Sequence, residues 1–254
     1  MELIILPVFG FLVGTIGTLA GIGGGIFIVP FLLLACGFTP QLAVGTGLLV
    51  VLCNSLSGTV AYAFQKQRID YRVGVFFTVF VMPGVVIGSY ALNILPAALF
   101  KPIFSAILAI IAVYQIIRKP IDNDDSEMGI PDKAGTNRYI FLAAISCLTG
   151  FVAGFMGIGG GIIHIPVLIF LVGLSVHRAT ATSHFILFFT SLAAVIDNGI
   201  MGHIDYRTGL ILGIGAILGA QAGAYISRRT RPRIIILMLS VVLILTALKM
   251  LIKV

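Results

Sequence analysis

Two glycine clusters are the part of this chain best suited to chemistry. The first contains Gly23, Gly24 and Gly25, and the second contains Gly159, Gly160 and Gly161. Consecutive glycines destabilise a helix and leave backbone N–H groups without helical partners. Together with the positive end of the helix that follows, such N–H groups can bind an anion without any charged side chain. We therefore predict an anion-binding role for both clusters; the alternative is close helix packing through small residues.

Polar side chains recur in the long apolar segment that follows each cluster. Thr46 and Asn54 lie within about 80° of arc on a helix that advances ~100° per residue, so they share one face. In the second half, Thr182 repeats Thr46, and Ser183 begins a similar polar stripe. We predict that these hydroxyl and amide groups bind substrate along a pathway. The alternative is hydrogen bonding between neighbouring helices.

Three ionisable residues lie inside the apolar segments: His164, His184 and Asp197. Burying a charge in hydrocarbon costs about 3 kcal/mol or more, so such residues are candidates for carrying a coupling proton. The two histidines replace Ile28 and Leu48 of the first half, so they have no counterpart there. A neutral histidine bonded to a neighbouring helix is the alternative, and Asp197 is close enough to its segment end to reach the interface.

The two halves of the chain are copies of one unit. Gly21 to Ile26 repeats as Gly157 to Ile162 at an offset of 136, and Ile69 to Arg72 repeats as Ile204 to Arg207. Each copy is an apolar run broken by glycines. A duplicated membrane unit with a broken helix in each half is the sequence pattern of a secondary transporter, and the breaks indicate the substrate site.

Composition places the chain among multi-pass membrane proteins. Hydrophobic residues make up 59% of it and charged residues 10%, outside the range of soluble domains. We attribute the net charge of +7 to basic cytoplasmic loops and the lipid surface rather than to nucleic acid. The three cysteines have no metal-site spacing, and there is no Walker motif. We therefore expect no metal and no cofactor.

Three parts follow from the pattern: a first membrane repeat over 1–118, a polar acidic linker over 119–138 and a second repeat over 139–254. Each repeat contains five apolar segments. In the first they cover 3–20, 22–36, 42–63, 73–92 and 97–117, and in the second 139–155, 158–172, 178–198, 208–226 and 233–252. The second segment of each repeat has about 15 residues, or roughly 22 Å of helix against ~30 Å of hydrocarbon. We predict an all-α fold in which these segments are re-entrant or discontinuous.

The positive charges predict the orientation of these segments. With five segments per half, 12 of the 16 Lys and Arg residues fall on one side of the membrane and 4 on the other. The positive-inside rule makes the richer side cytoplasmic. Because five is odd, the halves have opposite orientations, with the linker in the cytoplasm and both termini outside.

The motif Gly-x-Gly-Gly-Gly-x-x-x-Val-Pro from Gly21 to Pro30, repeated from Gly157 to Pro166 with Ile165 for the valine, resembles the TauE/SafE family of sulfite and organosulfonate exporters. The resemblance covers essentially the whole chain. It implies a prokaryotic inner-membrane permease for a small anion, such as sulfite or an organosulfonate, that works by alternating access.

Two other classes of protein stay open, as do several properties of a transporter. One is an integral-membrane enzyme that uses His164 or His184, although no HExxH motif or paired carboxylates support it. The other is an accessory membrane subunit whose glycines serve packing only. For a transporter, the direction of transport, the coupling proton or ion, and assembly into homo-oligomers are not fixed by the residues.

Overall fold

The computed structural model describes residues 2–64, 69–117 and 136–227, together with 230, 241, 244–246 and 248. These residues form helices and no strands. The first half contains α1 (Glu2–Leu19), α2 (Gly25–Leu34), α3 (Pro40–Phe64), α4 (Tyr71–Ile94) and α5 (Ala97–Ile117). The second contains α6 (Thr136–Met156), α7 (Gly161–Val167), the π-helical turn η1 (Leu168–Val172), α8 (Val176–Ile200) and α9 (Tyr206–Ser227).

These helices confirm the predicted all-α fold, with corrections at three boundaries. α2 and α7 begin at Gly25 and Gly161, three residues later than predicted, because the preceding glycines adopt left-handed backbone angles. α6 begins at Thr136, so the last three residues of the predicted linker are helical. The rest of that linker and most of the predicted segment 233–252 lie outside the described residues.

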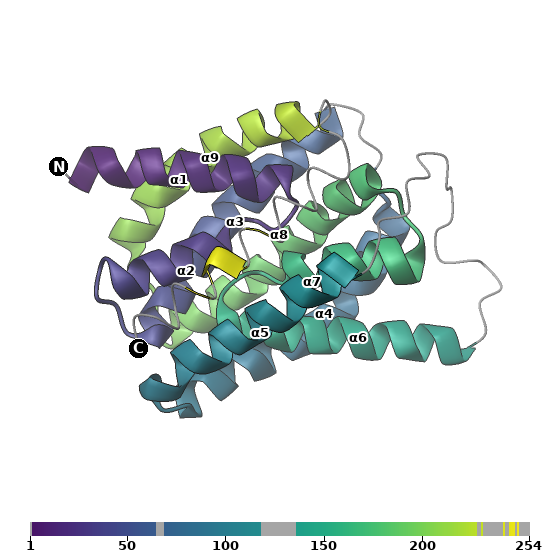
Figure 1. Ribbon diagram of the computed structural model, residues 1–254, viewed down its shortest axis with the longest axis horizontal. Helices are drawn as coiled ribbons and strands as arrows, with labels where there is room; N and C mark the ends of the chain where they lie inside the picture. Colours follow the sequence, from purple (N-terminus) through teal and green to yellow (C-terminus); the bar gives the residue numbers. More distant parts are fainter. Residues whose placement is uncertain are drawn as a thin grey trace.

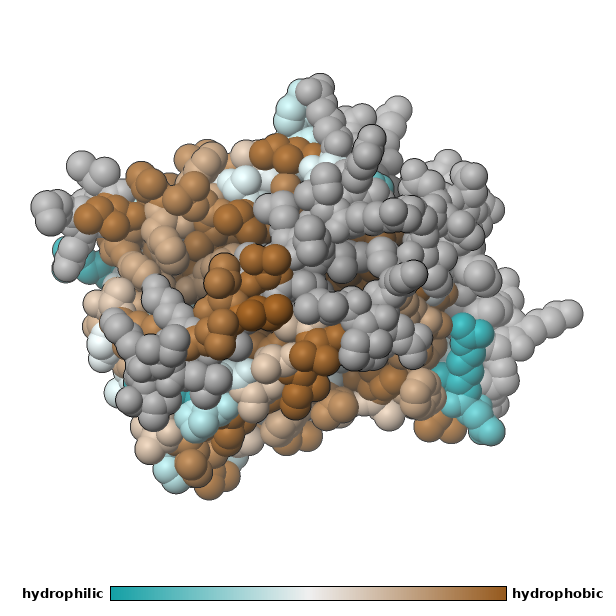
Figure 2. Space-filling model, viewed as in Figure 1, coloured by the Kyte–Doolittle hydropathy of each residue, from teal (hydrophilic) through white to brown (hydrophobic). Residues whose placement is uncertain are grey.

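Five of the described helices, α3, α4, α6, α8 and α9, are long and apolar enough to cross a membrane. Large apolar side chains on their outer faces are exposed, for instance Ile196 at 57% and Ile214 at 60%. Figure 2 shows apolar residues spread over much of the described surface rather than confined to an interior. Such a surface suits contact with lipid chains.

The helices pack in matched pairs drawn from opposite halves. α1 lies against α9 along one edge, and α4 lies against α6 along the opposite edge, with α3 and α8 between them (Figure 1). Glycines permit the close approach: a Cβ on Gly14 would lie 2.6 Å from the carbonyl oxygen of Ala216, and one on Gly154 would overlap the carbonyl oxygen of Val85. Small residues bring membrane helices together in this way.

The contacts between α3 and α8 are also matched. Ser55 and Ser191 are equivalent positions of the two copies, and their hydroxyl oxygens are 3.4 Å apart. Equivalent residues that touch each other lie where two copies meet about a shared axis. The two glycine clusters lie close to this meeting point, since Gly23 and Gly159 both pack against Val51 and Leu187.

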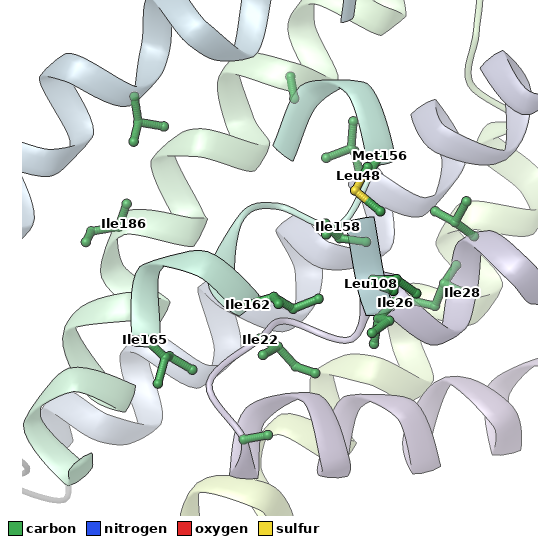
Figure 3. Packing of buried hydrophobic residues seen from close by; sticks show 14 of the residues in the cluster. Ile22, Ile26, Ile28, Leu48, Leu108, Met156, Ile158, Ile162, Ile165 and Ile186 are labelled. Atoms are coloured by element: carbon green, nitrogen blue, oxygen red, sulfur yellow. The ribbon is translucent and has the colours of Figure 1, made fainter. Parts of the chain in front are cut away.

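The core lies around the same point. Ile22, Ile26, Ile158 and Ile162 are almost completely buried and gather where the two glycine loops cross (Figure 3). Each isoleucine flanks one of the glycine clusters. The core therefore holds both loops in place from opposite halves of the chain.

Candidate functional site

The two glycine loops have the same backbone conformation. α1 ends at Leu19, and the chain passes through Gly23 (φ 75°) and Gly24 (φ 83°) before α2 begins. In the second half, Gly159 (φ 72°) and Gly160 (φ 86°) precede α7. Left-handed angles are disfavoured for residues that carry a Cβ. The glycine clusters therefore break the helices, as the sequence predicts.

Six backbone N–H groups at matched positions of the two loops have no hydrogen-bond partner in the described part of the chain. They belong to Gly24, Gly25 and Ile26 in one half and to Gly160, Gly161 and Ile162 in the other. All six residues are buried. Buried N–H groups without partners are rare in folded proteins, and each costs about 1–3 kcal/mol. The loops thus present two sets of free donors in the interior.

The two loops interlock at their crossing. A Cβ on Gly25 would lie 2.7 Å from the carbonyl oxygen of Gly157, and one on Gly161 would lie 2.7 Å from that of Gly21. This close approach alone explains why glycine is needed at 25 and 161. At Gly24 and Gly160, the positive φ adds a separate requirement.

Ser183 is the predicted hydroxyl that lies at the glycine loops. Its Oγ donates to the carbonyl oxygen of Gly21 at 2.9 Å, and its side chain is fully buried. The equivalent position of the first half is Gly47, whose absent Cβ would lie 3.7 Å from the carbonyl oxygen of Gly157. A hydroxyl is therefore supplied to one loop and not to the other.

Thr46 and Thr182 join the two halves to each other. The hydroxyl of Thr182 accepts a hydrogen bond from the backbone N–H of Asp70 at 3.0 Å, and that of Thr46 accepts one from Asp205 at 2.9 Å. Both aspartates are N-caps, accepting from the N–H groups of Val73 and Thr208. Each threonine hydroxyl thus anchors the first turn of a helix from the opposite half.

The repeated Ile-Asp-Tyr-Arg sequence explains this anchoring only in part. Asp70 also forms an ion pair with Arg178 of α8, with 3.1 Å between Oδ2 and the guanidinium nitrogen. An aspartate in this position can cap a helix, which accounts for the carboxylate but not for the threonines. The threonine partners were missed, because nothing in the local sequence connects Thr46 to a residue 159 positions away.

The two histidines lie in different places. His164 is fully buried beside the second loop, where a Cβ on Gly160 would lie 3.2 Å from its Cε1, and its ring meets Phe77 edge-on at 6.3 Å.

His184 packs on α3, where a Cβ on Gly58 would lie 2.7 Å from its Nδ1 and the Tyr62 ring lies 5.4 Å from its own ring. Neither ring nitrogen of His164 has a partner among the described residues, whereas the His184 ring lies beside the Thr18 backbone of α1. For His184 this contact fits the alternative considered above, a neutral histidine bonded to a neighbouring helix.

Asn54 and Asp197 complete the predicted set. Asn54 is fully buried and accepts a hydrogen bond from the Thr18 hydroxyl at 3.1 Å, while its Nδ2 has no partner in the described chain. Asp197 lies in the last turns of α8 and is partly exposed. The described residues contain no group of three or more His, Cys, Asp or Glu side chains placed to bind a metal ion.

Comparison with known proteins gives a consistent result over almost the whole chain. The family model described as sulfite exporter TauE/SafE matches residues 6–250. The "Probable membrane transporter protein YunE" of Bacillus subtilis is 34% identical, with 96% of each chain covered. "Probable membrane transporter protein MJ0441" of Methanocaldococcus jannaschii is 30% identical, covering 95% of this chain and 93% of its own.

A more distant relative is the "Probable membrane transporter protein YfcA" of Escherichia coli, which is 24% identical over 89% of this chain and 82% of its own. No solved structure matches the chain. The family match spans both glycine loops and all of the helices that hold them. This multi-pass membrane protein is therefore a member of the TauE/SafE sulfite exporter family.

Proposed function

We propose that the protein is a secondary transporter that moves a small anion across the membrane by alternating access. The proposed substrate is a sulfur oxoanion, such as sulfite or an organosulfonate. One observation carries the proposal: the six free, buried N–H groups of the two glycine loops. The relatives named as membrane transporters support this class of function over an enzyme.

The loops are suited to an oxoanion because they supply donors and no formal charge. The free N–H groups at the start of a helix form the positive end of the helix dipole and therefore attract an anion. An oxoanion has several oxygen atoms, each able to accept more than one hydrogen bond. It can therefore satisfy N–H groups from both loops at once and relieve the cost of leaving them unpaired. Ser183 adds a hydroxyl beside the first loop.

Transport requires the loops to open, since all of the residues from Gly21 to Gly25 and from Gly157 to Gly161 are buried. The burial of both loops supports an occluded state in the proposed cycle. In the proposed opening, the helix pairs α1 with α9 and α4 with α6 separate in turn, each on its own side of the point where the two glycine loops cross. Thr46 lies on α3 and Thr182 on α8, so their hydrogen bonds to the N–H groups of Asp205 and Asp70 would move with these helices.

The proposed setting is the inner membrane of a prokaryotic cell. In this arrangement the two repeats have opposite orientations, the linker over 119–138 faces the cytoplasm and the termini face outward. The matched contacts between halves support such a repeat arrangement. The charge bias of 12 against 4 supports the placement of the linker.

Flux through proteoliposomes containing the purified protein tests the proposal. Radiolabelled sulfite, thiosulfate, isethionate and phosphate are offered in turn, with gradients of protons or sodium imposed separately. Saturable uptake of at least one sulfur anion, above that of empty liposomes, is the expected result. If none of the sulfur anions is transported under any gradient, the proposed function is wrong.

A further inference from the structure

We propose that the ion pair between Arg178 and Asp70, which we call the Asp70 latch, holds the protein closed on one side of the glycine loops only. This inference rests on the proposed transport function, because alternating access requires opening on both sides. It adds that the two openings are unequal. Under the proposed orientation, the latched side faces the cytoplasm.

Asp70 connects the start of α4 to α8 at two points. Its Oδ2 is 3.1 Å from a guanidinium nitrogen of Arg178, and its backbone N–H donates to the Thr182 hydroxyl at 3.0 Å. Arg178 and Thr182 are four residues apart on a helix, so they share one face. The other carboxylate oxygen, Oδ1, accepts from the N–H of Val73 and caps α4. The carboxylate thus caps its own helix and pairs with a neighbouring one.

The equivalent contact of the other half has only one of these two connections. Asp205 caps α9, and its N–H donates to the Thr46 hydroxyl at 2.9 Å. The position equivalent to Arg178 is Leu42, at the offset of 136 that also relates Thr46 to Thr182. Leu42 and Arg178 are both half-buried, but a leucine cannot pair with a carboxylate. One side of the protein therefore has an ion pair where the other has an apolar side chain.

The ion pair is placed where it can contribute to the closed state. Fully exposed ion pairs contribute little, because water and salt screen them. Here the exposed fractions of the side chains are 26% for Arg178 and 15% for Asp70. Hydrogen bonds between two charged groups are also stronger than those between neutral groups. The cap and the Thr182 contact already hold Asp70 in position, so little further ordering is needed to form the pair.

The latch lies close to the part of α8 that contacts the first glycine loop. Two residues after Arg178, the Cα of Thr180 would lie 3.2 Å from a Cβ on Gly21. The equivalent residue Val44 contacts the second loop in the same way, with its Cα 2.9 Å from a Cβ on Gly157. Thr180 and Val44 are both fully buried. They are therefore matched positions for reporting the opening of each side.

The two proposed openings break different sets of contacts. Moving the start of α4 away from α8 breaks both connections of Asp70, the ion pair and the hydrogen bond to Thr182. Moving the start of α9 away from α3 breaks the single hydrogen bond between Asp205 and Thr46. The alternative is that the ion pair only stabilises the fold. In that case, removing it would loosen both sides equally.

Cysteine accessibility at the two matched positions tests the latch. The three native cysteines are replaced by alanine, and Thr180→Cys or Val44→Cys is introduced singly. The rate of reaction of the purified protein with a small water-soluble thiol reagent is measured, because a buried thiol reacts only when the structure opens. In Arg178→Leu, which copies Leu42, Thr180→Cys should react at least about threefold faster. Val44→Cys should keep its rate.

Three further variants sharpen the comparison. Asp70→Asn removes the charge but keeps an oxygen that can cap α4, so it should act as Arg178→Leu does. Leu42→Arg places an arginine opposite Asp205 and should slow the reaction of Val44→Cys. Arg207→Leu is the control, because it also removes an arginine from the first turn of a helix, but an exposed one. It should change neither rate.

Two results overturn the latch. One is an unchanged rate at Thr180→Cys in both Arg178→Leu and Asp70→Asn. The other is an equal acceleration at both probe positions, which would mean that the ion pair only stabilises the fold. If wild-type proteoliposomes transport a sulfur anion, either result leaves the proposed function standing. Absence of transport, together with two probes that stay unreactive in every variant, overturns the proposed function as well.

Discussion

Replacing Thr46 or Thr182 with valine should destabilise the protein by similar amounts. Valine keeps the shape of threonine and removes the hydroxyl that accepts from the backbone N–H of Asp205 or Asp70. That N–H then loses its partner at a partly buried helix start. A donor left unsatisfied costs about 1–3 kcal/mol; partial burial places the expected loss at about 1–2 kcal/mol for each variant.

Thr190→Val is the matched control for these two substitutions. Thr190 is also fully buried, but its hydroxyl donates to the Ile186 carbonyl of its own helix, which keeps its helical partner without it. No group is stranded, so the expected loss is about 0.5 kcal/mol, the low end for a hydrogen bond removed without leaving a donor unpaired. Reversible unfolding in detergent, followed by circular dichroism, measures all three variants. The reasoning is refuted if Thr190→Val costs as much as the other two, or if Thr46→Val and Thr182→Val are both neutral.

The remaining predictions concern packing, protons and orientation. Gly84→Ala should prevent folding, because its Cβ would overlap the carbonyl oxygen of the neighbouring helix α6; normal yield of folded protein in membranes would contradict this. If His164 or His184 carries a coupling proton, replacing it with glutamine should flatten the dependence of flux on pH, and unchanged profiles for both variants would leave them without that role. Cysteines introduced into the linker over 119–138 and the loop over 228–233 should both react with reagent from the cytoplasmic side. Labelling from opposite sides would rule out the arrangement of five plus five segments.

The sequence was sufficient to predict the helices and the breaks between them. Apolar runs of membrane-spanning length and repeated glycine clusters are local signals, and the observed helices follow them within a few residues. The delayed starts of α2 and α7 were missed because a run of residues such as Gly23-Gly24-Gly25 does not show which glycine adopts a positive φ. That choice depends on the partner loop, which packs against Gly25 and Gly161.

The candidate side chains were predicted less completely than the loops. Ser183 lies at a glycine loop as expected, whereas Thr46 and Thr182 have partners at helix starts of the opposite half. The contacts of Tyr62 with the Thr18 carbonyl and the His184 ring were not foreseen. Thr18, Tyr62 and Ser227 are single polar residues on apolar helices, and only the tertiary contacts bring them to His184. The local pattern of apolar and polar residues does not predict contacts between residues so far apart in the sequence.

Equilibrium binding of radiolabelled sulfite to the purified protein tests the central claim most directly, namely that the loop backbone binds the anion. The comparison is among wild type, Gly24→Ala, Gly160→Ala and Leu32→Ala. Each glycine substitution adds one methyl group at a φ above 80° and displaces the free N–H groups. Leu32 is fully buried in the core, and its truncation costs about 2–5 kcal/mol of stability without touching the loops.

The account predicts that each glycine variant folds, as judged by gel filtration and circular dichroism. Its affinity for sulfite should nevertheless be at least 10-fold lower than that of the wild type. Leu32→Ala should unfold more easily yet keep the affinity of the wild type within about twofold. Wild-type affinity in a folded protein carrying both Gly24→Ala and Gly160→Ala would contradict the account, because the glycine clusters would then serve packing alone.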